Sequence, residues 1–154
     1  MPEDIGDRIE KRVTLNAPPA RVWKAVSDAK EFGTWFGVDF LGREFAPGVS
    51  LTGKITDPPE YAGAEFNIDV AEIQPPRMIS FRWHPFAGDV NYDYSNEPMT
   101  LIEFVVTPEG DGTLLTVTES GFEGIPAERR RQAFEMNSEG WAQQMARIAN
   151  YVRG

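Results

Sequence analysis

The C-terminal stretch of the chain, residues 126–152, reads PAERRRQAFEMNSEGWAQQMARIANYV. Its large apolar side chains recur at steps of three, four and seven residues, which is the spacing of one face of an α-helix. This apolar stripe consists of Phe134, Trp141, Met145, Ile148 and Val152. At ~1.5 Å per residue such a helix is about 40 Å long, enough to cross a whole small sheet. The stretch therefore predicts a long helix that buries one face against a sheet.

The residues before this helix carry the alternation of apolar and polar side chains that is typical of half-buried strands. In residues 8–15, for example, Ile9, Val13 and Leu15 fall on one face. Turns that contain proline or glycine separate the later segments of this kind. The pattern predicts further strands over residues 48–56, 65–73, 78–84, 100–106 and 113–119.

Two short helices are expected between the first two strands. Residues 16–19, Asn-Ala-Pro-Pro, end the first strand and open a helix whose apolar side contains Val22 and Val26, because proline is tolerated in a first helical turn. A second helical piece covers residues 29–35 and is closed by Gly37. One strand, two short helices, a run of strands and a long closing helix indicate an α+β domain with the helix laid over the sheet.

The composition excludes several classes of function. The chain has 154 residues, the usual length of one domain, so residues 1–154 are expected to form a single domain. With 15 basic and 24 acidic residues its net charge is −9. Such a surface repels nucleic-acid phosphates and anionic lipid, so we expect neither partner. The chain has no cysteine and one histidine, which excludes disulfides and thiolate catalysis and predicts no metal site.

The N-terminal segment predicts no export signal. Residues 1–7 are acidic and lack an apolar core, unlike a signal peptide. No stretch of the sequence approaches the roughly 18 apolar residues of a membrane-spanning helix. We therefore expect a cytoplasmic protein.

Three passages of the sequence resemble one known family. They are residues 17–28, APPARVWKAVSD, running on to Trp35-Phe36-Gly37; residues 115–122, LTVTESGF; and residues 140–148, GWAQQMARI. The third passage is close to a Gly-Trp-x-x-x-Leu-x-x-Leu pattern. In this order the passages are similar to the activator of heat-shock-protein-90 ATPase homologue-like family, within the START-like (SRPBCC, birch-pollen-allergen-like) superfamily.

This resemblance implies a more specific fold than the periodic pattern does. It implies the helix-grip fold, in which a curved antiparallel sheet, two short helices after its first strand and a long C-terminal helix enclose a hydrophobic cavity. It implies no particular reaction, because most bacterial relatives have none assigned and analogy of fold is a weak basis for function.

Given this fold, the inward-facing apolar side chains are expected to line a ligand cavity, although in most proteins the same pattern marks a packed core. Many of these side chains are aromatic and one is a methionine, which suits a pocket that adapts to varied ligands. The expected lining residues are Phe66, Ile68, Phe81, Trp83, Ile102, Phe104, Leu115, Val117, Phe134, Trp141 and Met145.

Three polar residues share these faces. Glu119 continues the face of Leu115 and Val117, so its carboxylate is expected to face the pocket; the alternative is a strand-end position in water. Arg130 and Asn137 lie on the stripe of the long helix and are expected to meet the polar head of a ligand, since a guanidinium suits a carboxylate. Alternatively, both side chains project beyond the edge of the core.

Three further features have less defined roles. His84 is expected at the surface or at a strand end, because a catalytic or metal-binding role would need partners that the sequence does not show. Residues 84–98 form a long connection, either a lid that closes with Tyr92 and Tyr94 or a plain hairpin. Met136 lies opposite the apolar stripe of the long helix. The one role we assign to it is contact with a second copy of the chain in a homodimer.

These observations favour a binding protein for a small hydrophobic or aromatic molecule, with no catalytic residue and no cofactor assigned. One alternative is an enzyme of the polyketide cyclase/aromatase or lyase kind, in which Glu119 or Arg130 moves protons in the same cavity. A buried, hydrogen-bonded polar cluster would favour that alternative. The second alternative is a co-chaperone that stimulates a heat-shock ATPase. The eukaryotic activators of that type carry an additional N-terminal domain, which is not expected here because the first strand begins near residue 8.

Overall fold

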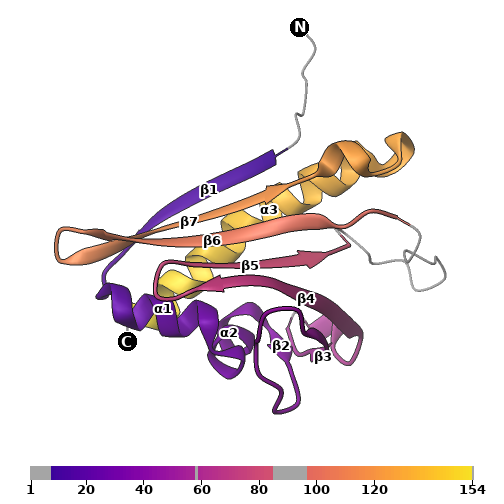
Figure 1. Cartoon of the computed structure of the whole chain (residues 1–154). Helices are drawn as coiled ribbons and strands as arrows, with labels where there is room; N and C mark the ends of the chain where they lie inside the picture. Colours follow the sequence, from indigo (N-terminus) through magenta and orange to yellow (C-terminus); the bar gives the residue numbers. More distant parts are fainter. Residues whose placement is uncertain (1–7, 58, 85–96, 154) are drawn as a thin grey trace, which may run out of the picture.

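The computed structural model describes residues 8–57, 59–84 and 97–153. Its centre is a seven-stranded antiparallel sheet in the order β1-β7-β6-β5-β4-β3-β2 (Figure 1). The first strand thus pairs with the last, and the sheet continues from there to a two-residue edge strand. The strands are β1 (Arg8–Leu15), β2 (Val38–Asp39), β3 (Ser50–Ile55), β4 (Glu65–Gln74), β5 (Met78–Trp83), β6 (Thr100–Glu109) and β7 (Gly112–Ser120).

Two short helices lie between β1 and β2. The first is α1 (Pro19–Ser27) and the second is α2 (Ala29–Phe36). The side chain of Asp28 begins α2 by accepting a hydrogen bond from the backbone N–H of Lys30, as expected of an N-cap. Gly37 ends α2 with a φ of 100°, a left-handed conformation that glycine adopts without strain.

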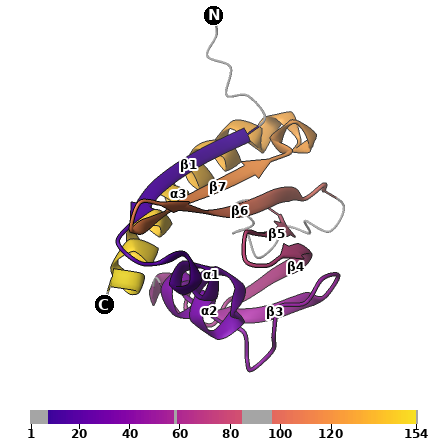
Figure 2. The same cartoon turned by 60° about the vertical axis from the view of Figure 1, so that its left-hand side comes forward.

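The long helix α3 (Ala127–Arg153) covers one face of the sheet, runs obliquely to the strands and meets α1 and α2 near its C-terminal end (Figures 1 and 2). Despite its length, neither it nor any other helix of the described residues is both long and apolar enough to cross a membrane. The antiparallel sheet with the long helix α3 on one face confirms the expected α+β helix-grip architecture. The buried side chains of α3 are Ala133, Trp141, Met145, Ile148 and Val152.

Several local features were not predicted by the alternation of side chains. Strand β2 and the 3₁₀ helices Pro59–Tyr61 and Phe122–Gly124 are too short to produce a periodic pattern. The pairing of β4 with β5 shifts in register between Val70 and Glu72, which is typical of a β-bulge. The alternation that predicted β4 therefore holds only up to this point.

Aromatic rings fill the space between the sheet and the helices. The ring of Phe32, in α2, lies 5.5 Å from that of Phe81 and 5.8 Å from that of Phe104. Phe104 in turn lies 5.7 Å from Trp141, whose ring stacks on Trp83 at 5.6 Å. The expectation that Phe81, Trp83, Phe104 and Trp141 face one common space is confirmed.

Candidate functional site

Glu119 is an acidic residue on the apolar face of the sheet. It lies near the end of β7, opposite Ile9 of β1 and Ile102 of β6, and its exposed fraction is 0%. The prediction that it faces inward is confirmed, and the alternative of a strand-end carboxylate in water is wrong. A carboxylate in this position requires hydrogen-bond donors that replace the lost water.

Four side chains donate hydrogen bonds to the Glu119 carboxylate. The indole Nε1 groups of Trp83 and Trp141 lie 2.8 Å from Oε2 and Oε1, respectively. The Thr100 hydroxyl lies 2.5 Å from Oε2, and Nδ2 of Asn137 lies 3.0 Å from Oε1 and 3.1 Å from Oε2. We refer to these donors and Glu119 as the Glu119 cluster.

The Glu119 cluster fixes two indole rings that come from different elements. Trp83 ends β5, whereas Trp141 lies in the middle of α3. An indole N–H can only donate, so the buried Trp141 and the partly buried Trp83 each need an acceptor, and both use the same carboxylate. The two rings lie nearly parallel, with centroids 5.6 Å apart and an interplanar angle of 18°. The carboxylate therefore holds this stacked pair of indole rings, which forms one wall of the site, in place.

A small hollow adjoins this wall between α2, β5 and α3. Its volume is about 110 Å³. A cavity of about 150 Å³ can hold one benzene molecule, whereas pockets for drug-sized ligands measure about 300–1,000 Å³. The hollow is therefore smaller than a benzene-binding cavity and can take at most one small ring. We call it the aromatic hollow; it is lined by Phe36, Trp83, Met136, Asn137, Gly140, Trp141 and Gln144.

Two side chains of α3 hold the α2 wall of the aromatic hollow. Nε2 of Gln144 donates to the carbonyl oxygen of Phe36 at 3.1 Å, and Nε of Arg147 donates to that of Trp35 at 2.8 Å. Both carbonyls belong to the last turn of α2, where helical donors are missing. Arg147 also forms an ion pair with Asp57 at 2.6 Å. Hydrogen bonds as well as packing thus set the position of Phe36 relative to α3.

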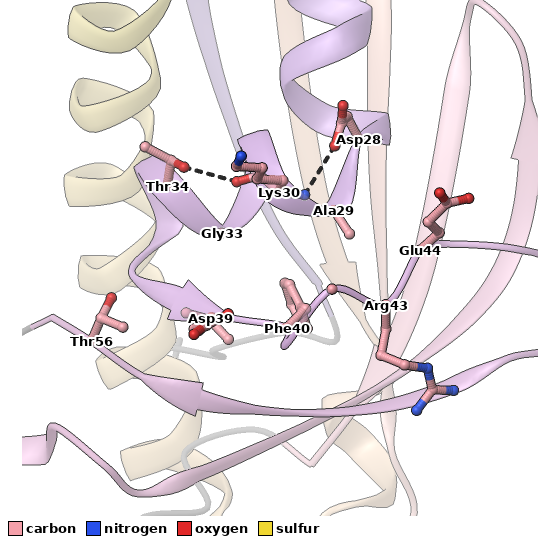
Figure 3. Close-up of a pocket in the computed structure, with 12 residues that line it drawn as sticks. Asp28, Ala29, Lys30, Gly33, Thr34, Asp39, Phe40, Arg43, Glu44 and Thr56 are labelled. Atoms are coloured by element: carbon pink, nitrogen blue, oxygen red, sulfur yellow. Dashed lines mark hydrogen bonds between the residues drawn. The ribbon is translucent and has the colours of Figure 1, made fainter.

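A second, larger depression lies beside α2 (Figure 3). This outer groove has a volume of about 650 Å³ and is bordered by α2, β2 and the segment that follows β2. Asp28 and Asp39 within it accept hydrogen bonds from nearby backbone N–H groups. Figure 3 shows the side chains of Arg43 and Glu44 pointing in different directions. Because its charged groups do not converge on one point, the outer groove is the weaker candidate for a specific ligand.

The residues expected to line a cavity fall into two groups. Trp83, Asn137 and Trp141 line the aromatic hollow, and the ring of Phe66 lies 5.6 Å from that of Trp83. The remaining sheet residues and one residue of α3 are buried in the packed core, where a ligand role for them stays a prediction. These residues are Ile68, Phe81, Ile102, Phe104, Leu115, Val117 and Met145.

Two predicted residues lie in the first turns of α3, outside the lining of the aromatic hollow. The Arg130 guanidinium donates to the carbonyl oxygens of Ile125 and Glu123, each at 3.1 Å. The ring of Phe134 packs on that of Phe122 at 5.1 Å. These contacts hold the turn that precedes α3, and a ligand role for Arg130 or Phe134 stays a prediction.

His84 directly follows β5. Its Nε2 lies 3.1 Å from the carbonyl oxygen of Glu97, so the residue occupies the strand end, as expected. Most of the predicted lid or hairpin, including Tyr92 and Tyr94, lies outside the described residues. Within the part of the chain that the structure describes, no three His, Cys, Asp or Glu side chains are grouped so that they could hold a metal ion.

Four lining residues of the aromatic hollow were not predicted. Met136, Gly140 and Gln144 follow one another at steps of four, so they form one ridge of α3. From the sequence alone, this spacing could have predicted that the three residues lie on one ridge of the long helix. The assignment of Met136 to the opposite side of the helix is corrected, because this residue is 47% exposed and yet lines the hollow from the flank of the stripe. Phe36 gave no signal, since its place depends on how α2 packs on α3.

The fold and the site together define a helix-grip protein with a small, aromatic-walled hollow between its sheet and its C-terminal helix. The chain belongs to the family described as "Activator of Hsp90 ATPase homolog 1-like protein", whose profile matches residues 16–153. The resemblance carried by three short passages is thereby confirmed over nearly the whole chain. No curated protein matches the chain.

Solved structures share this fold. DynU16, a protein of the dynemicin biosynthetic locus, is 26% identical to this chain, with a TM-score of 0.71. The match covers 96% of this chain and 48% of DynU16, so the chain spans about half the length of that relative. A protein from Arthrobacter aurescens is 19% identical, with a TM-score of 0.77 and coverage of 99% and 90%. CalU16 from Micromonospora echinospora is 20% identical, with a TM-score of 0.63 and coverage of 94% and 75%. The last two show the fold alone.

Proposed function

We propose that the chain binds a small hydrophobic or aromatic molecule and seats one ring of it in the aromatic hollow. The observation that carries this proposal is the hollow itself, with a volume of about 110 Å³ and walls formed by Phe36, Trp83 and Trp141. Flat aromatic walls suit a flat ligand, because offset or edge contacts between rings add to the energy of burial.

The Glu119 cluster supports this proposal by making the site rigid. Trp83 and Trp141 are each tied to the carboxylate by a 2.8 Å hydrogen bond, so their rings have little freedom to lose when a ligand binds. A preorganised wall increases affinity because less side-chain ordering accompanies association. DynU16, which comes from a biosynthetic locus, is consistent with a small molecule as the ligand.

A ligand larger than one ring requires a change at the rim of the aromatic hollow. Met136 lines the hollow and is 47% exposed. Its unbranched side chain can adopt other rotamers at low energetic cost. We therefore expect a longer ligand to displace Met136 while its ring remains between Phe36 and the two indoles.

NMR spectroscopy of the indole N–H groups tests the proposal, with toluene as the probe. The chain has four tryptophans, and the Trp83 and Trp141 signals report on the hollow. Toluene is expected to shift both signals in a saturable manner and to leave the signal of Trp23, in α1, unchanged. Absence of saturable binding by toluene, and by other single-ring probes, would contradict the proposal.

A blocking variant identifies the place of binding. An added Cβ at Gly140 meets no atom within 4 Å, so Gly140→Leu is expected to occupy part of the hollow without disturbing the fold. Affinity for toluene should fall at least tenfold, about 1.4 kcal/mol. Ala142→Leu adds the same side chain at an exposed neighbouring position and should bind as the wild type does. Equal binding by the two variants would show that toluene sits elsewhere.

An enzyme of the cyclase or lyase kind is the second candidate, and the Glu119 cluster is the observation that favours it. A buried carboxylate beside a hollow is the kind of group that can move protons. However, both oxygens already accept hydrogen bonds from Trp83, Thr100, Asn137 and Trp141, so a substrate would have to displace a donor. Native mass spectrometry can identify a copurifying molecule. If the mass of the copurifying molecule stays the same on incubation with the protein, the molecule is a ligand. A mass change that the wild type causes and Glu119→Gln does not cause indicates an enzyme.

We also propose that the protein is cytoplasmic and that it forms a homodimer through a contact at Met136. The net charge of −9 disfavours nucleic acid and anionic lipid as partners, which leaves the small molecule as the principal one. The exposed Met136 side chain is the apolar group that a second copy would cover. Sedimentation of Met136→Lys beside the wild type tests this contact, and an unchanged monomer–dimer equilibrium would exclude it.

A further inference from the structure

We infer that the aromatic hollow prefers a positively charged ring without N–H groups, such as an N-alkylpyridinium, over a neutral ring of the same shape. This inference rests on the proposed function, since it names the chemical class of the ligand for the same site. It depends on the buried charge of Glu119 and on the side chains that separate this charge from the hollow.

The hydrogen-bond partners of Glu119 suit a charged carboxylate. The indole N–H groups of Trp83 and Trp141 can only donate, and each lies 2.8 Å from one carboxylate oxygen. Nδ2 of Asn137, which also can only donate, lies 3.0 Å and 3.1 Å from the two oxygens. A carboxylic acid would need an acceptor for its own proton, and of the four partners only the Thr100 hydroxyl could serve. The Glu119 cluster therefore accommodates a negative charge.

This negative charge has no basic partner in the parts of the chain that the structure describes. All 15 lysine and arginine residues lie in those parts, and none of them forms an ion pair with Glu119. Arg147, the basic residue that is closest in sequence to the lining residues of α3, is paired with Asp57 at 2.6 Å. Arg130 donates to two backbone carbonyls. The charge of Glu119 is therefore not neutralised by an ion pair.

The charge lies directly behind the lining of the aromatic hollow. Trp83, Asn137 and Trp141 each line the hollow and each donate to Glu119. One side chain thus separates the carboxylate from a cation in the hollow. Because Glu119 is 0% exposed, little water screens the attraction between the two charges, and this attraction requires no contact. An anionic ring in the same place would be repelled.

The burial of Glu119 also determines which kind of cation fits. A ligand cannot touch this carboxylate, so a primary ammonium group would lose hydrogen bonds to water without gaining one from Glu119. A ring nitrogen that carries an alkyl group has the same charge and no N–H. Met136 at the rim is 47% exposed, so a charged ring keeps part of its contact with water, which limits the cost of dehydration.

The aromatic lining favours a cation as well. Phe36, Trp83 and Trp141 are three of the lining residues. The face of an aromatic ring attracts a cation, and an indole does so more strongly than a phenyl ring. A wall of aliphatic side chains would offer no such attraction, so the lining and the buried charge act in the same direction.

N-methylpyridinium, toluene and benzoate are the probes that test this inference, with the indole N–H signals of Trp83 and Trp141 as the readout. N-methylpyridinium and toluene have the same shape and differ in charge. N-methylpyridinium is expected to bind the wild type about fivefold more tightly than toluene does. Benzoate, the anionic ring, should not bind at tenfold the concentration.

Glu119→Gln removes the charge and keeps the shape of the side chain. This variant is expected to prefer toluene, because burial of the more apolar ring then decides the order. A purely structural role of Glu119 would weaken both probes alike and leave their ratio unchanged. Glu103→Gln removes one negative charge from the neighbouring strand β6, outside the lining of the hollow, and should keep the wild-type ratio.

A second pair of variants covers the case in which Glu119→Gln does not fold. Met136→Lys places a positive charge at the rim and should weaken N-methylpyridinium more than toluene, whereas Met136→Leu should keep the wild-type ratio. Binding of toluene by the wild type without a preference for N-methylpyridinium would overturn this inference and leave the proposed function intact. A preference that persists in Glu119→Gln would also overturn it, and failure of every probe to bind would overturn both.

Discussion

Glu119 is the residue on which the candidate site depends most. Glutamine at this position would keep the shape of the side chain but place an NH₂ group among four donors. At least one buried donor would then lose its acceptor, at a cost of roughly 1–3 kcal/mol for each group.

We expect Glu119→Gln to lower the free energy of unfolding by about 3 kcal/mol, which corresponds to a Tm decrease of roughly 6–12 °C. Thermal denaturation followed by circular dichroism measures this change. Glu103→Gln, on the neighbouring strand β6, is the matched control and should stay within about 0.5 kcal/mol of the wild type. A Tm of Glu119→Gln within 2 °C of wild type would show that the four donors find other partners.

Gly140 is a residue whose replacement should stabilise the protein. It lies inside α3, and an added Cβ meets no atom within 4 Å. Alanine restricts the unfolded chain more than glycine does, so Gly140→Ala is expected to raise the free energy of unfolding by roughly 0.5–1 kcal/mol. Urea denaturation provides the measurement. Gly33→Ala is the contrasting variant, because its Cβ would lie 2.1 Å from the carbonyl oxygen of Val38; it should be clearly destabilised.

At the scale of elements, a polar contact joins α1, α2 and α3 away from the aromatic hollow. Arg21 forms an ion pair with Glu31 at 2.6 Å, and the Tyr151 hydroxyl donates to Glu31 at 3.2 Å. The Arg21 guanidinium also lies over the Tyr151 ring, 5.0 Å from its centroid. Burial is the main cause that raises the pKa of Tyr151 above 10, and the hydrogen bond with Arg21 partly opposes it.

This contact predicts how stability changes at alkaline pH. Because the pKa of Tyr151 is higher in the folded than in the unfolded chain, its contribution to stability is complete below pH ~10 and is lost as the pH rises through the folded-state pKa. NMR titration of the Tyr151 ring should give a midpoint above that of the urea-unfolded chain. Equal midpoints would contradict the prediction, and Tyr151→Phe identifies the signals and removes the effect.

The sequence predicted the helices and strands better than it predicted the space between them. The stripe that ends at Val152 and the alternation in β5, β6 and β7 follow from local periodicity, so these elements and their inner faces were correct. Glu119 was placed on the inner face by the same alternation. Its four donors come from β5, β6 and α3, and no local pattern indicates that they meet.

At the scale of the whole molecule, the position and size of a hollow are the least predictable features. The aromatic hollow is the small volume that remains after α2, β5 and α3 have packed, so shifts of a few ångströms would close or enlarge it. The sequence predicted a cavity lined by residues such as Phe81 and Phe104. In the structure the ring of Phe32 lies 5.5 Å and 5.8 Å from their rings, and a ligand role for them stays a prediction. The aromatic hollow lies along α3 beside Gly140, which has no side chain to fill this space.

Binding in such a hollow should stabilise the entire fold. The lining residues come from α2, β5 and α3, which lie together only in the folded chain, so a ligand of the hollow binds the folded state alone. At a free toluene concentration of tenfold Kd, the free energy of unfolding should rise by about 1.4 kcal/mol, which corresponds to a Tm increase of roughly 3–6 °C. Differential scanning calorimetry measures this shift. Ala142→Leu should show the full shift. Gly140→Leu should show a shift of roughly 1–2 °C at most, because its side chain occupies part of the hollow. A full shift in Gly140→Leu would mean that toluene stabilises the protein from another site.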